Sequence, residues 1–118
     1  MTLTTAVLAG PARATEHQQL QTFAACAGRL SAVMEYQWMF DGVASERTKA
    51  QRATVLQLIE AVMPEDMGRE VLHWRISAKL AQSALLTRAT FNDDPADAAW
   101  ATQTADRLTR DCTAFLLS

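Results

Sequence analysis

The chain has 118 residues, of which 49% are hydrophobic and 20% are charged, so it has room for one domain around one core. Its low glycine and proline content excludes a collagen-like rod or a disordered polar tract. The formal net charge is −2 without any basic stripe, and no apolar run approaches the ~20 residues that span a bilayer. We therefore expect no nucleic-acid partner and no transmembrane segment.

Residues 1–14 have the pattern of the second half of a secretory signal peptide. A short run of apolar and small residues over 2–10 is followed by Ala12-Arg13-Ala14, the A-x-A triplet that signal peptidase recognises. A positively charged start is missing, which is explained if translation begins upstream of Met1; the alternative is a disordered tail on a cytoplasmic protein. We expect a periplasmic or secreted protein whose single helical domain covers residues 15–118.

From Thr15 onward, apolar residues recur at three- and four-residue spacing, which predicts helices. The first helix is predicted over residues 15–41, with Thr15 opening a capping box and Gly42 ending the helix. The second helix is predicted over residues 45–63, with Ser45 as its N-cap.

The second half of the chain predicts two more helices, over residues 66–90 and 94–117. The third has the broadest apolar face, and we expect it to be the most central helix. The fourth has the clearest start, because Asp94 can cap it and Pro95 suits its first position. Four helices joined by short connections predict an all-α, up-down-up-down four-helix bundle.

The only two cysteines, Cys26 and Cys112, fall on the first and fourth predicted helices. These helices are antiparallel neighbours in such a bundle, and both cysteines lie on apolar faces at similar levels. In an oxidising compartment, a single pair of this kind predicts a disulfide. In a cytoplasmic protein, the same two residues would be buried thiols.

A metal site is one alternative to a purely structural bundle. Glu70 and His73 form an E-x-x-H motif that resembles one half of the site in ferritin-like di-iron bundles. Glu35 and Glu60 could supply single carboxylates from the first two helices. The fourth helix contains neither histidine nor glutamate, so half of the site is missing, and we expect no cofactor.

Catalytic signatures are missing as well. The two histidines lie on different predicted helices, no G-x-S-x-G motif occurs, and the four glycines are isolated from one another. The sequence therefore predicts no catalytic residue and favours a function in binding.

Small residues on the first helix indicate a close approach by another helix. Gly28 and Ser31 are part of this cluster, and a glycine inside a helix usually has a packing or functional reason. Close helix packing is one explanation. The other is the floor of a binding groove, with Arg29, Arg75 and Lys79 among its polar lining.

Aromatic residues crowd the end of the first predicted helix, and they cannot all face the core. We predict an interaction patch there, to which the fourth helix contributes a tryptophan; the alternative is that the side chains pack under the connecting loops. The members of the predicted patch are Tyr36, Trp38, Met39, Phe40 and Trp100.

Together these features favour an exported, non-catalytic binding or interaction module. Its partner would be a protein or a small apolar ligand. The alternatives are a metal-binding four-helix protein that uses the E-x-x-H motif, and a cytoplasmic adaptor or regulatory bundle.

Overall fold

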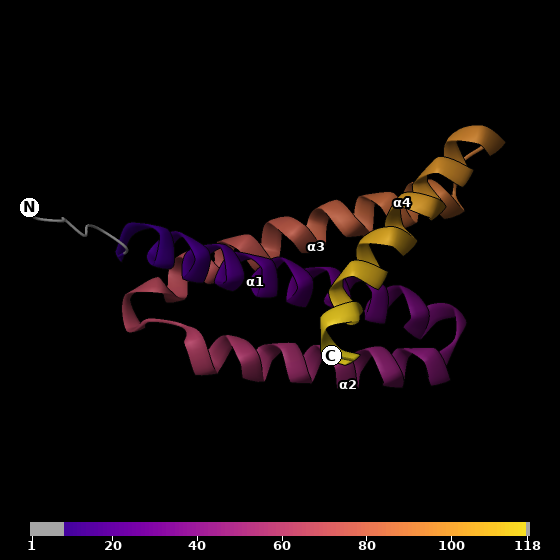
Figure 1. Ribbon diagram of the computed structural model, residues 1–118. Coiled ribbons are helices and arrows are strands. Elements are labelled where there is room, and N and C mark those ends of the chain that lie inside the picture. The colour runs from indigo at the N-terminus through magenta and orange to yellow at the C-terminus, as the bar shows by residue number, and fades with distance from the viewer. Residues whose placement is uncertain (1–8, 118) are drawn as a thin grey trace, which may run out of the picture.

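A computed structural model describes residues 9–117, and every regular element in this range is a helix (Figure 1). The helices pack against one another, which confirms the predicted all-α four-helix bundle. No helix in the described range is long and apolar enough to cross a membrane. In chain order, the elements are α1 (Ala9–Phe40), α2 (Gly42–Val62), the 3₁₀ turn η1 (Glu65–Met67), α3 (Gly68–Thr90), α4 (Pro95–Ala114) and the 3₁₀ turn η2 (Phe115–Leu117).

Helix α1 is the central element, because α2, α3 and α4 all pack against it. Helices α2 and α3 follow separate flanks of α1, and within the described helices they make no extended contact with each other. Helix α4 starts at the far end of α3 and returns across the front of the molecule toward the middle of α1 (Figure 1). The prediction that the third helix is the most central is therefore wrong.

The first two helices begin earlier than predicted. Helix α1 starts ahead of Thr15, which lies inside the helix instead of at its cap. Helix α2 starts ahead of Ser45, because the side chain of Asp41 accepts a hydrogen bond from the Ala44 amide (3.1 Å) and caps the helix. The predicted signal segment overlaps the described range only at residues 9–14, which belong to α1, so export stays a prediction.

The connection from α3 to α4 has the cap that the sequence predicts. The carboxylate of Asp94 accepts hydrogen bonds from the first backbone amides of α4, and Pro95 is the first residue of that helix. Arg88 donates two hydrogen bonds to Asp97 (2.6 and 2.5 Å), and Asn92 donates a third (2.7 Å). These hydrogen bonds hold the pKa of Asp97 below its ordinary value of 3.8, and the bond from Arg88 has the largest effect.

The core lies along α1, whose small residues let the other helices come close. Its buried members are Leu20, Ala24, Ala27 and Leu30 from α1, Val55 and Ile59 from α2, and Val71 from α3. Gly28 allows the closest approach: a β-carbon built there would overlap the carbonyl oxygen of Arg75 on α3. The backbones of α1 and α3 therefore touch at this point, which is the packing explanation for a glycine inside a long helix.

Cys26 and Cys112 form a disulfide between α1 and α4, as predicted. Both residues are buried, their Cα atoms are 5.3 Å apart, and 86 positions separate them in the sequence. Because α4 packs mainly on α3, this bond is its principal attachment to the central helix.

Candidate interaction surface

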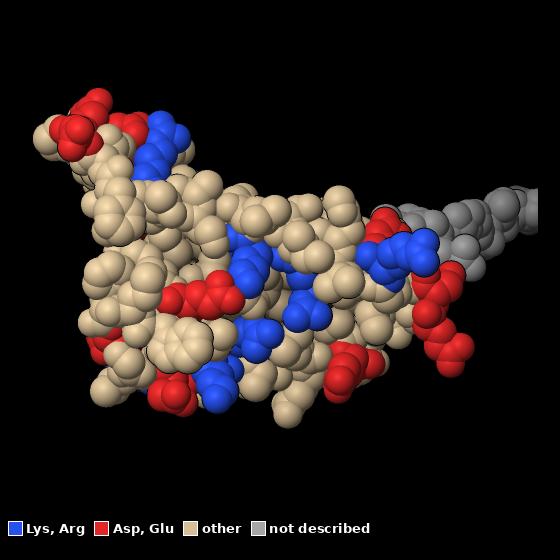
Figure 2. Space-filling model, turned by 180° about the vertical axis from the view of Figure 1, so that it is seen from behind, with Lys and Arg blue, Asp and Glu red and all other residues tan. Residues whose placement is uncertain are grey.

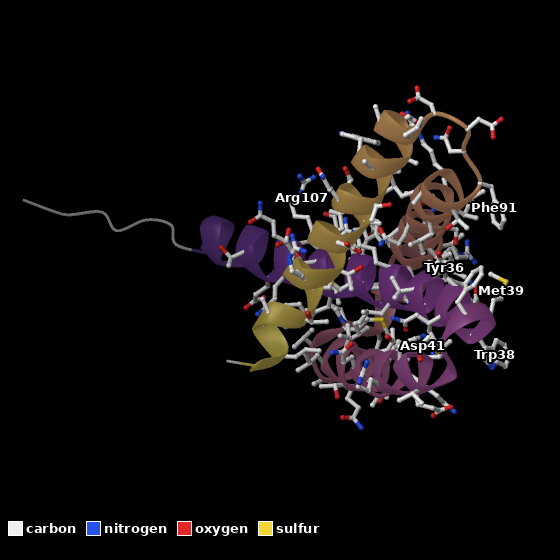
Figure 3. All side chains as sticks on the ribbon, turned by 90° about the vertical axis from the view of Figure 1, so that its right-hand side faces the viewer. Tyr36, Trp38, Met39, Asp41, Phe91 and Arg107 are labelled. Carbon is white, nitrogen blue, oxygen red and sulfur yellow. A yellow bond between two sulfur atoms is a disulfide. The ribbon has the colours of Figure 1, made fainter. Side chains whose placement is uncertain are left out.

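Large apolar side chains are exposed where α1 turns into α2. Trp38, Met39 and Phe40 end α1, Val43 opens α2, and Phe91 lies beside them at the end of α3 (Figure 3). The exposed fractions of these five residues range from 59% to 76%. We call these five residues the apolar end. They lie at the end of α1, at the start of α2 and directly after α3, at one end of the bundle.

Two residues predicted for this patch have other surroundings. Tyr36 is half-buried, and its hydroxyl is 2.8 Å from the hydroxyl of Thr90, which ties α1 to the end of α3. Trp100 lies on α4, where the guanidinium of Arg88 stacks over its ring at 5.0 Å. Trp100 is therefore not part of the apolar end, whereas Tyr36 borders it, with its ring centroid 4.9 Å from that of Phe40.

Two members of the apolar end are not predicted from the sequence. Val43 falls between two predicted helices, in a stretch that sequence reasoning assigns to a connection. Phe91 directly precedes the Asn92-Asp93-Asp94-Pro95 turn. One signal was available: in an up-down bundle, the connection after the third helix lies at the same end as the connection after the first.

A groove runs along α1 between α2 and α3, on the face opposite α4. Its floor is α1, and its walls are α2 on one side and α3 on the other. It is lined by Gly28, Ser31, Arg52, Leu72, Arg75, Ile76 and Lys79. We call this the basic groove. A second depression lies farther along α1 and α3, and its lining includes Trp38 and Met39 of the apolar end.

The basic groove holds three cations. Arg52 donates from Nε to the hydroxyl of Ser31 (2.6 Å), and Lys79 pairs with Glu35 at 2.8 Å. Arg75 has no carboxylate partner among the described side chains. Figure 2 shows this face, with Lys and Arg side chains gathered near its middle and most carboxylates toward its margins. The groove therefore has a surplus of positive charge.

Of the residues that the sequence suggests for a groove, Gly28, Ser31, Arg75 and Lys79 line this one, and Arg29 does not. Gly28 and Ser31 form part of its floor. Arg29 lies on the opposite side of α1, where Nη1 is 3.7 Å from the sulfur of Cys112. The prediction of Arg29 as a groove residue is therefore wrong, because one step along a helix turns the side chain by about 100°.

The four predicted metal ligands do not converge. Glu60, Glu70 and His73 are exposed on α2 and α3, and Glu35 is paired with Lys79. No three His, Cys, Asp or Glu side chains within the described part of the chain are placed to hold a metal ion. The E-x-x-H motif thus lies on a solvent-exposed surface, and in the described part of the chain the four residues considered as ligands do not share one site.

Comparisons of this chain with protein-family models, with curated proteins and with solved structures find no significant match.

Proposed function

We propose that this protein is a non-catalytic binding module that docks a partner protein on its apolar end. The observation that carries the proposal is the clustering of five large apolar side chains, each more than half exposed, at one end of the molecule. Contiguous exposed apolar patches mark interaction sites, and Trp, Phe and Met are enriched at the centres of protein interfaces.

A protein partner fits this surface better than a small apolar ligand. Small ligands are bound in concave pockets that bury most of their surface. The apolar end instead lies on the outside of one end of the bundle, and Trp38, the most exposed of its members at 76%, points away from the helices (Figure 3). A projecting aromatic side chain is suited to insertion into a pocket of a partner.

The proposed setting is an oxidising compartment, the periplasm or the exterior. The buried Cys26–Cys112 disulfide supports this setting, because such bonds persist in oxidising compartments and are rare in the cytoplasm. The mass of the native protein after alkylation without reductant tests it. Two alkylated thiols would favour the cytoplasmic adaptor instead, and an unmodified chain cleaved after Ala14 would support export.

Retention of a partner by matched variants tests the docking site. Immobilised wild-type protein, W38E/M39E and V62E are exposed to soluble extract of the native host, and retained proteins are quantified by mass spectrometry. Val62 is the control, because it is 46% exposed but lies at the opposite end of α2. We expect a partner that V62E retains and that W38E/M39E loses by roughly tenfold or more. Equal retention by all three proteins would refute the proposal.

A further inference from the structure

We propose that the basic groove binds an acidic amphipathic helix of the partner protein. Carboxylates of that helix meet Arg52 and Arg75, and its apolar side packs on α3. This inference rests on the proposed function, because it names the kind of segment that the partner presents. Three independent features of the groove support it: its shape, its apolar wall and its charge.

The shape of the groove leaves α1 accessible between two helices. Helix α1 forms the floor, and α2 and α3 form walls that make no extended contact with each other. Gly28 and Ser31 mark where the groove meets α1. Along α1, the lining of the groove and of the neighbouring depression runs from Gly28 to Met39, about 16 Å at 1.5 Å per residue.

The apolar wall has the spacing that a second helix needs. Leu72, Ile76 and Leu80 follow one another at four-residue intervals along α3, and they are 49%, 49% and 65% exposed. Side chains at this spacing form a ridge, and ridges of this kind pack into the grooves of neighbouring helices. In the described structure α1 and α4 cover other faces of α3, so this ridge has room for a partner helix.

The charge of the groove favours an acidic segment. Arg52 is hydrogen-bonded to a neutral hydroxyl, and Arg75 has no carboxylate partner in the described range. Both side chains are half-buried between the walls, where lower solvent exposure strengthens their attraction for carboxylates. Glu35 offsets only Lys79. A helix with carboxylates facing the floor would complete these pairs, whereas a basic helix would be repelled.

A pair of designed peptides tests the charge preference. The first is a fluorescein-labelled 14-residue helix with leucine along one face and glutamate elsewhere, and the second has lysine in place of every glutamate. Binding to the full chain is measured by fluorescence anisotropy. We expect the glutamate peptide to bind roughly tenfold or more tightly than the lysine peptide, and to weaken as salt is raised.

Charge reversal locates the binding site. The R52E/R75E variant should bind the glutamate peptide roughly tenfold or more weakly than the wild type does. The matched control is R107E/R110E, which reverses two exposed arginines on α4 and should change the affinity less than about twofold. Arg107 lies on the opposite side of the molecule from Trp38 and Met39 in Figure 3. I76S removes part of the apolar ridge without changing charge, and it should also weaken binding.

Several results would overturn the inference: equal binding of both peptides, unchanged binding to R52E/R75E that keeps its helical circular dichroism, or binding of phosphatidylglycerol vesicles in place of the peptide. If R52E/R75E does not fold, the affinity of I76S for the glutamate peptide decides the question, and unchanged binding would overturn the inference. The partner-retention experiment separates this inference from the proposed function. A partner that W38E/M39E loses but R52E/R75E retains would support docking on the apolar end and would refute helix binding in the basic groove.

Discussion

Replacing Gly28 with alanine would test whether α1 and α3 are held in backbone contact. A β-carbon at this position overlaps the carbonyl oxygen of Arg75 and lies 3.0 Å from both the Arg75 carbonyl carbon and the Lys79 amide nitrogen. Ordinary van der Waals contact begins near 3.4 Å. All three neighbours are backbone atoms of α3, so no side chain can rotate away and the helix itself must move.

Two opposing effects set the magnitude. Alanine stabilises a helix interior by about 1 kcal/mol relative to glycine. Overpacking a close-packed interface costs about 1–3 kcal/mol, and the upper part of this range applies when backbone has to shift. We therefore expect G28A to lower the free energy of unfolding by about 1–2 kcal/mol. For a domain of this size, the melting temperature should fall by roughly 4–15 °C.

Urea unfolding followed by circular dichroism at 222 nm, without reductant, measures this change. G68A is the matched control, because Gly68 is also helical but has nothing within 4 Å of a built β-carbon. We expect G68A to unfold like the wild type or to gain up to about 1 kcal/mol. If G28A also gained stability, α1 and α3 would not be in backbone contact at Gly28, and the packing argument would fail.

Three further predictions follow from the same structure. C26A/C112A should lose about 4–5 kcal/mol of stability, since the bond closes a loop of 86 positions, and reductant should lower the melting temperature of the wild type but not of this variant. D97N should lower the melting temperature at neutral pH. Because the pKa of folded Asp97 lies below 3.8, the stabilisation is present above pH 3.8 and fades as the pH falls below it, so the difference between the two proteins should vanish in acid. W38S and M39S should each change the free energy of unfolding by less than about 0.5 kcal/mol in chemical denaturation, and a larger loss would mean that these side chains belong to the core.

The sequence predicts the helices well but not all of their ends. Asp94 followed by Pro95 is a strong local signal, and α4 begins there. Thr15 and Ser45 are equally plausible caps by residue type, yet both lie inside helices. Ser45 is buried and donates to the carbonyl of Met34, so a contact between α1 and α2 decides its place. Cap preference is a local property, whereas such a contact depends on the packed bundle.

The candidate surface is only partly predictable for the same reason. Trp38, Met39 and Phe40 are consecutive, so at least one of them must leave the core whatever the fold. Arg29 and Ser31 are two positions apart on α1, yet they face opposite sides of the bundle. Their assignment to one groove fails because that groove is defined by where α2 and α3 pack.

By itself, the sequence determined four helices and the start of the last one, and it allowed only one disulfide if the cysteines are oxidised. These depend on local spacing and on there being only one pair to form. Only the tertiary structure decided that α1 is central and that Leu72, Ile76 and Leu80 remain uncovered. The physical reason is that helical periodicity fixes which residues share a face, whereas burial depends on which helix packs against that face.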